Sequence, residues 1–119
     1  MLAPAVSKGP IPQASPMEPA SKGEPRLLVQ DLADLPPPVF DEAHLERALS
    51  LGLADHAAGA LWIRHSFAPS GLSLVGVTAR CRVALHTWPE RQALSLDLYG
   101  TAPELEQLFT ACLDALRAP

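Results

Sequence analysis

Apolar and polar positions alternate along two stretches in the second half of the chain, Cys81 to Trp88 and Ala93 to Tyr99. A period of two is that of a β-strand, whose successive side chains point to opposite faces of a sheet. Two more stretches, Leu61 to Phe67 and Leu72 to Ala79, have strand character and are separated by a turn that contains Pro69 and Gly71. Because the links between these strands are short, we expect an antiparallel sheet.

Two other segments have the period of an amphipathic helix. The first is preceded by Asp41, a good N-cap, and its apolar stripe comprises Leu45, Ala48, Leu49, Gly52 and Leu53. The second begins near Thr101, whose hydroxyl and the Glu104 carboxylate can each satisfy a free backbone N–H group. Its stripe comprises Leu105, Leu108, Phe109, Cys112, Leu113 and Leu116.

A further strand is predicted over Arg26 to Asp31, ahead of the first helix, and the prolines at 36–38 are expected to prevent regular structure after it. The order is then one strand, a helix, four strands and a helix. This order predicts an α+β fold, a two-layer sandwich in which an antiparallel sheet carries both helices on one face. The other face would stay partly apolar, which favours a dimer that forms a larger sandwich.

Composition narrows the setting of this domain. Residues 1–24 are rich in Pro, Ala and Ser and are predicted to be a disordered tail, which leaves 25–119 as the folded domain. With 13 acidic residues against 9 basic ones, the net charge argues against nucleic acid as a partner. No apolar run is long enough for a membrane span and the start of the chain does not have the layout of a secretion signal, so we expect a cytoplasmic protein.

Few residues carry chemistry by their local pattern. Cys81 stands between two arginines, and nearby positive charge favours the reactive thiolate. His65 and His86 lie on strands, where a structural role is the more common one, and Cys112 fits the apolar face of a helix as a core residue. The sequence has no paired metal-ligand spacing, so we expect no metal. It also has no G-x-S-x-G elbow and no phosphate-binding glycine loop.

Two motifs taken together carry a resemblance to a known family. They are H-S-F-A-P-S-G-L-S at 65–73 and R-C-R-V-A-L-H-T-W-P-E at 80–90. They resemble the H-S-F-x-P-x-G-V-S and E-S-H-L-S-I-H-T-W-P-E of the short prokaryotic S-adenosylmethionine decarboxylases, with the same spacing from His65 to Asp97. The resemblance implies an enzyme that cleaves its own chain and keeps a pyruvoyl group, which forms a Schiff base with S-adenosylmethionine for decarboxylation in spermidine synthesis.

The resemblance also implies roles for single residues. Ser73 and His86 match the pair that assists self-cleavage. Phe67, Trp88 and Glu90 match residues that hold the adenosyl part of the substrate. Aromatic faces stack on adenine, and a carboxylate accepts hydrogen bonds from ribose hydroxyls.

The chain departs from the family pattern at four positions. Cys81 replaces the serine that becomes pyruvoyl, Arg80 the glutamate before it, Ala84 a second serine, and Thr101 the cysteine that protonates the product. A thiolate can attack the preceding carbonyl to give a thioester, and β-elimination from cysteine leads to the same pyruvoyl group. The Thr101 hydroxyl, however, is a poorer proton donor than a thiol.

Three functions therefore remain open. The leading hypothesis is a homodimeric decarboxylase for S-adenosylmethionine or a related amino acid, with Cys81 as the pyruvoyl precursor. The second is a catalytically inactive member that acts as a binding or regulatory subunit beside an active relative. The third is an α+β module without a small-molecule role.

Overall fold

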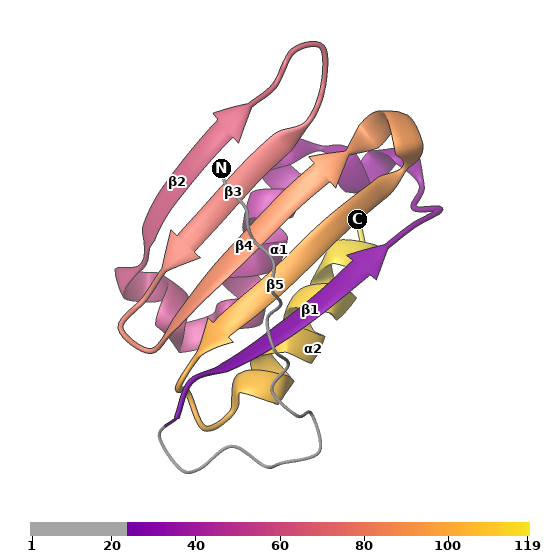
Figure 1. Cartoon of the computed structure of the whole chain (residues 1–119). Helices are drawn as coiled ribbons and strands as arrows, with labels where there is room; N and C mark the ends of the chain where they lie inside the picture. The colour runs from indigo at the N-terminus through magenta and orange to yellow at the C-terminus, as the bar shows by residue number, and fades with distance from the viewer. Residues whose placement is uncertain (1–23) are drawn as a thin grey trace, which may run out of the picture.

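The computed structural model describes residues 24–119, so the tail predicted over 1–24 lies outside the described residues except for Glu24. Five strands form one antiparallel sheet in the order β1-β5-β4-β3-β2. Their bounds are β1 Arg26–Leu32, β2 Leu61–Ser66, β3 Leu72–Val77, β4 Cys81–Trp88 and β5 Ala93–Gly100. Helices α1 (Glu42–Leu53) and α2 (Leu105–Arg117) cover one face of the sheet (Figure 1). The predicted two-layer α+β sandwich is confirmed.

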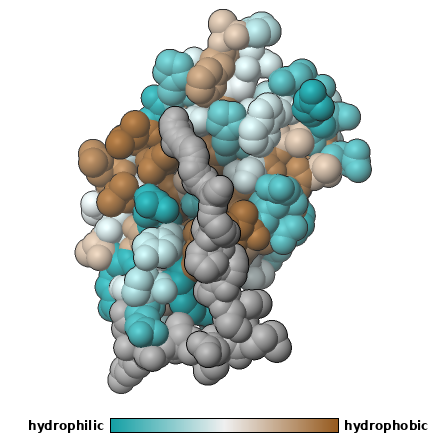
Figure 2. All heavy atoms as spheres, in the orientation of Figure 1, coloured by the Kyte–Doolittle hydropathy of each residue, from teal (hydrophilic) through white to brown (hydrophobic). Residues whose placement is uncertain are grey.

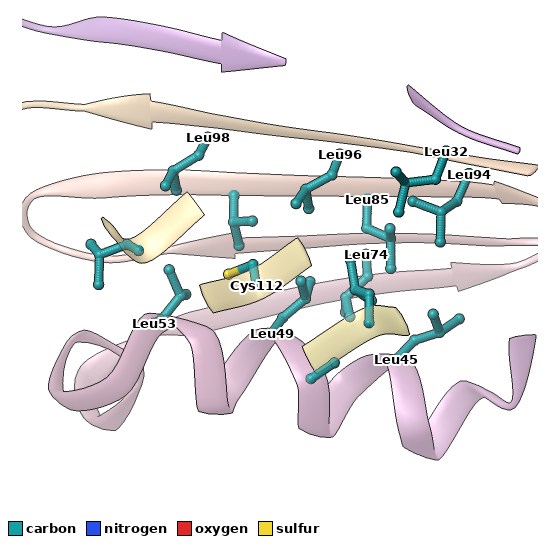
Figure 3. Packing of buried hydrophobic residues seen from close by; sticks show 14 of the residues in the cluster. Leu32, Leu45, Leu49, Leu53, Leu74, Leu85, Leu94, Leu96, Leu98 and Cys112 are labelled. Atoms are coloured by element: carbon teal, nitrogen blue, oxygen red, sulfur yellow. The ribbon is translucent and has the colours of Figure 1, made fainter. Parts of the chain in front are cut away.

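The hydrophobic core lies between the sheet and the two helices (Figure 3). Alternate residues of β4 and β5 point into it. The buried residues of the α1 stripe meet them from the other side, chiefly Leu45, Leu49 and Leu53. The helices approach closely at Gly52, where a Cβ would overlap Cys112. Cys112 is fully buried, which confirms its place in the core, and this burial raises the pKa of its thiol to about 12.

The start of α1 agrees with the sequence and the start of α2 does not. Asp41 caps α1, because its side chain accepts a hydrogen bond of 3.0 Å from the backbone N–H of His44. The capping box predicted at Thr101 and Glu104 is wrong: Glu104 itself is the N-cap of α2 and makes no side-chain capping bond. Its carboxylate instead accepts a hydrogen bond from His56 Nε2 at 3.1 Å, and this contact lowers the pKa of Glu104.

Short 3₁₀ turns complete the chain. One spans Pro37–Phe40, in the proline run that was expected to have no regular structure. Proline fits there because the first turn of a helix does not need its N–H groups. The other turns are Ala54–Gly59 and Pro89–Arg91.

Within residues 24–119, no helix is long and apolar enough to cross a membrane. The cytoplasmic location stays a prediction.

The face of the sheet opposite the helices, called here the open face, carries exposed apolar side chains. They are Leu27, Val29, Leu61, Ile63, Val77 and Tyr99. Their register places them in two rows across the strands, and Figure 2, seen from this side, shows hydrophobic atoms gathered there. The partly apolar outer face is confirmed, and the dimer that it favours remains a prediction.

Candidate functional site

The residues singled out from the sequence gather at the two ends of β4. At the end nearer Trp88, His86 is paired in register with Ser73 of β3. The Ser73 hydroxyl is hydrogen-bonded to His86 Nδ1, and both side chains are half-buried on the open face. A hydroxyl hydrogen-bonded to an imidazole in this way can exchange a proton with it.

Aromatic rings surround this pair. The ring centroids lie 4.5 Å apart for His65 and Phe67, 5.6 Å for Phe67 and His86, and 4.4 Å for His86 and Trp88. Phe67 is 43% exposed and Trp88 41%, so their faces are available to a ligand. His65, for which a structural role was the more common expectation, is part of this aromatic cluster.

The geometry of the loop between β2 and β3 positions the Phe67 ring. The N–H of Phe67 donates to the carbonyl of Gly71 at 2.8 Å, which closes the loop between β2 and β3. Gly71 has φ +118°, a conformation that glycine adopts far more readily than other residues.

Glu90 is exposed and lies in the 3₁₀ turn that follows Trp88. It thus lies at the end of β4 where the rings of Phe67, His86 and Trp88 gather, called here the aromatic end. Its ribose-binding role remains a prediction.

The opposite end of β4 holds the Arg80–Cys81 peptide bond in the turn that follows β3. The backbone N–H of Thr78 donates to the carbonyl of Cys81 at 2.8 Å. The Thr78 hydroxyl oxygen accepts from the N–H groups of Arg80 (3.2 Å) and Cys81 (3.0 Å) and lies 3.4 Å from Cys81 Sγ. The Cys81 side chain points to the helix side of the sheet and is 5% exposed.

Thr101 lies beside the same peptide bond. Its backbone N–H donates to the carbonyl oxygen of Arg80 at 2.8 Å, which is the carbonyl that Cys81 would attack. A donor aimed at this oxygen stabilises the negative charge that develops on it during the attack. The close approach requires Gly100, since a Cβ at this position would overlap the Arg80 carbonyl and Cys81. The role of the Thr101 side chain as proton donor stays a prediction.

The two arginines beside Cys81 do not both lie near its sulfur. The Arg82 guanidinium sits 5.4 Å from the centre of the Tyr99 ring, on the open face, whereas the thiol lies on the helix face. The Arg80 side chain reaches the backbone carbonyl of Thr101 at 3.4 Å. Adjacent positions of a strand point to opposite faces, so the charge of Arg82 is across the sheet from the thiol.

The two ends of β4 are too far apart to act together within one chain. His86 is five positions from Cys81, which is about 16 Å at about 3.3 Å per residue, and it points to the other face. Ser73 and His86 therefore do not reach the Arg80–Cys81 bond of their own chain. The resemblance had implied that this pair assists self-cleavage, and geometry permits this only between two chains.

Three residues of interest were not identified from the sequence. Thr78 could have been noticed because a Thr hydroxyl often accepts backbone N–H groups two or three positions on, and Gly100 because glycine inside a strand marks a close backbone approach. Asp97, on the open face between the two ends, has a buried oxygen, Oδ1, without a hydrogen-bond partner among the described residues. Burial raises the pKa of this carboxyl, and Arg82 partly opposes the shift.

A metal site finds no support in the described part of the chain. Within residues 24–119, no three His, Cys, Asp or Glu side chains are grouped so that they could hold an ion.

Comparisons with known proteins agree with this geometry. The sequence profile described as S-adenosylmethionine decarboxylase matches residues 26–119. The S-adenosylmethionine decarboxylase proenzyme of Parasynechococcus marenigrum is 30% identical over 94 residues, which cover 76% of this chain and 73% of that protein. The proenzyme of Methanococcus aeolicus is 31% identical over 94 residues, which cover 76% of this chain and 80% of that protein.

Other relatives match over a shorter length. The proenzyme of Thermococcus onnurineus is 37% identical over 54 residues, which cover 44% of this chain and only 38% of that relative. Among solved structures, the adenosylmethionine decarboxylase of Aquifex aeolicus superposes with a TM-score of 0.62 at 20% identity, covering 81% of this chain and 82% of that one, and so supports the fold. The profile match and the two relatives aligned over 94 residues show that this chain belongs to the S-adenosylmethionine decarboxylase family.

Proposed function

We propose that the protein is a pyruvoyl-dependent decarboxylase of S-adenosylmethionine that serves spermidine synthesis. The observation that carries the proposal is the Ser73–His86 hydrogen bond between the exposed rings of Phe67 and Trp88. It combines a proton-transfer pair with a stacking surface for a purine. These residues stand at the positions that match the family's motifs.

The Arg80–Cys81 turn suits self-cleavage. Cys81 Sγ attacks the Arg80 carbonyl through a five-membered ring, the C–N bond breaks, the thiol proton passes to the nitrogen, and a thioester results. A base then removes the Cα proton, and the Cβ–S bond breaks with its electrons on sulfur. Arg80 becomes a C-terminal thiocarboxylate, and the dehydroalanine takes up water and releases ammonia to become the pyruvoyl group. This group supplies a carbonyl that binds the substrate amine and withdraws electrons as carbon dioxide leaves.

The aromatic end of β4 binds the substrate. Phe67 and Trp88 present ring faces to the adenine, and Glu90 accepts hydrogen bonds from the ribose hydroxyls. His86, oriented by Ser73, holds or moves a proton at Nε2, the nitrogen that its bond to Ser73 leaves available.

A homodimer brings the two ends together. The chain separates His86 from Cys81 by about 16 Å, so a working site needs Cys81 and Thr101 from one chain and Ser73 and His86 from another. The exposed apolar side chains of the open face favour contact with a second copy. Asp97 Oδ1, buried there without a partner in residues 24–119, would gain one across such an interface.

Intact mass and carbon dioxide release test the activity. The purified chain should yield two fragments split between Arg80 and Cys81, the second with a pyruvoyl terminus, and should release labelled carbon dioxide from carboxyl-labelled S-adenosylmethionine. The Cys81→Ala variant should stay whole and release none. A chain that remains uncut after long incubation would exclude the decarboxylase.

Co-expression tests the shared site. Neither Cys81→Ala nor His86→Ala alone should be active, but a mixed dimer contains one complete site, built from the Cys81 of one variant and the His86 of the other. We therefore expect partial activity when both variants are co-expressed. Activity that stays absent in the mixed dimer, while a mixture with wild type is active, would contradict the two-chain site.

A non-catalytic binding subunit that pairs with an active relative is the second candidate. It is favoured by one contrast between the two ends of β4. The aromatic end keeps the residues that match substrate binding. The opposite end, called here the cleavage end, contains the Arg80–Cys81 turn and carries Cys81 and Thr101 in place of the family residues. This candidate predicts an uncut chain that still binds S-adenosylmethionine, measurable by calorimetry, and that loses binding in Trp88→Ala. A cut, active chain would rule it out.

A further inference from the structure

The position of the Thr78 hydroxyl is not explained by substrate binding. Its oxygen lies 3.0 Å from the nitrogen of Cys81 and 3.4 Å from Cys81 Sγ. Self-cleavage, the proposed function on which this inference rests, breaks the bond to this nitrogen and forms a bond to this sulfur. One hydroxyl therefore touches both the nucleophile and the leaving group of the reaction.

We propose that Thr78 is a catalytic residue of self-cleavage, which relays the thiol proton of Cys81 to the departing amide nitrogen. In the intact chain the Cys81 N–H donates to the Thr78 oxygen. As the Sγ–C bond forms, this nitrogen loses its amide character and gains a lone pair. The thiol proton moves to the Thr78 oxygen, and the hydroxyl proton of Thr78 moves to the lone pair of the Cys81 nitrogen. The C–N bond then breaks, which leaves a thioester and a free amine. The hydroxyl is regenerated, so no outside acid or base is consumed.

Within one chain, the surroundings leave this task to Thr78. Cys81 is 5% exposed, so bulk water has little access to the sulfur. His86 of the same chain lies about 16 Å away on the other face. Thr78 is the polar side chain that the structure places in hydrogen-bonding contact with Cys81 Sγ within residues 24–119.

A second group completes the arrangement on the other side of the peptide bond. The backbone N–H of Thr101 donates to the Arg80 carbonyl oxygen at 2.8 Å and stabilises the charge that forms as the sulfur attacks. The hydroxyl can also rotate, since the Thr78 oxygen lies 3.1 Å from the Cys81 carbonyl oxygen as well as 3.4 Å from the sulfur. Rotation of one O–H bond is enough to change the group that receives its proton.

Three substitutions separate a relay from a turn-forming role. Thr78→Ser keeps the hydroxyl. Thr78→Asn keeps an oxygen that accepts the backbone N–H groups of the turn, as asparagine commonly does, but its amide cannot pass a proton from sulfur to nitrogen. Thr78→Val removes both functions. Thr110→Val makes the same chemical change on the exposed surface of α2 and is the matched control.

Each variant is purified uncut and incubated at one pH, with and without hydroxylamine, which cleaves a thioester as soon as it forms. The rate at which intact mass shows fragments split between Arg80 and Cys81 is measured. We expect Thr78→Ser to cleave within a few-fold of wild type. We expect Thr78→Asn and Thr78→Val to be slower by about 100-fold, the usual size of a proton-transfer contribution, and Thr110→Val to be unchanged. Thermal unfolding identifies any variant that fails to fold.

Each contrary result has its own meaning. If Thr78→Asn cleaves as fast as Thr78→Ser, Thr78 only shapes the turn and the relay is overturned. If folded Thr78→Val cleaves like wild type, the hydroxyl has no part in the reaction. If wild type itself stays whole even with hydroxylamine, no thioester forms, and the proposed function fails before the relay is in question.

Discussion

The two ends of β4 differ in burial, in the face they use and in how closely they match the family. The aromatic end lies on the open face, has exposed rings, and keeps the residues that match substrate binding. The cleavage end lies in a tight turn, directs its thiol toward the helices, and carries the substituted residues. Eight residues of one strand are enough to separate these two parts of a site.

This separation implies that the two ends respond differently to substitution. We expect a change among the exposed rings to alter ligand affinity and to leave the core intact. We expect a change in the closely packed turn to alter stability and cleavage together, because the Arg80–Cys81 peptide bond is itself part of the packing. Substitutions can therefore test whether the two ends are independent within a chain.

The largest effect is expected from Gly100→Ala at the cleavage end. The added Cβ would overlap the Arg80 carbonyl and Cys81, and overpacking against backbone costs about 1–3 kcal/mol. We expect the free energy of unfolding, measured in urea, to fall by about this amount, and cleavage to slow because the Arg80 carbonyl must move away from the Thr101 N–H.

Gly59→Ala is the control for this change, since a Cβ at Gly59 meets nothing within 4 Å. It should leave stability and cleavage nearly as they are. If Gly100→Ala were as stable as wild type and cleaved at the same rate, the turn would be looser than the structure indicates.

An intermediate effect is expected from Trp88→Ala at the aromatic end. Stacking of a base on an aromatic ring contributes about 1–3 kcal/mol, so the affinity for S-adenosylmethionine, measured by calorimetry, should fall about ten-fold or more. Cleavage and stability should change little, because Trp88 is 41% exposed. Leu51→Ala, at a more exposed residue of α1, should change neither affinity nor cleavage, and a Trp88→Ala variant that lost cleavage would show that the two ends are coupled.

The sequence predicted the elements well, because alternation and helical periodicity record which side chains face the core. The faces of β4 and β5 and the α1 cap at Asp41 follow from such local patterns. The α2 cap did not, since Thr101 satisfies the motif but its backbone serves the turn at Arg80, and Glu104 pairs instead with His56, 48 positions away. Contacts between distant segments decide such cases.

The candidate site was predictable in membership and not in arrangement. The motifs identified Ser73, His86 and the aromatic residues as one group with Cys81. Strand parity already places His86 and Cys81 on opposite faces, but only the register with β3 and β5 shows what each one contacts. Thr78 lies outside both family motifs, and its place at the sulfur follows from the turn.

The smallest effect is expected midway between the two ends, from Asp97→Asn on the open face. Burial raises the pKa of Asp97 above its usual 3.8, so at a pH between 3.8 and the raised pKa the folded chain holds a proton that the unfolded chain has lost. Stability therefore falls as pH rises through the window above 3.8. Asparagine stays neutral, so the variant should unfold like wild type at lower pH and be more stable at pH 7, by less than about 1 kcal/mol because solvent screens a partly exposed carboxylate.

Urea unfolding at low protein concentration across this pH range measures the difference. Asp31→Asn, at an exposed carboxylate of the neighbouring strand β1, is the control and should show no such trend. Arg82→Ala should enlarge the effect, since Arg82 opposes the shift at Asp97. If the advantage of Asp97→Asn disappears as protein concentration rises, the carboxylate finds its missing partner in a second chain. If it persists, the open face leaves Asp97 unpaired even at high concentration, and a partner for Asp97 across the interface is excluded.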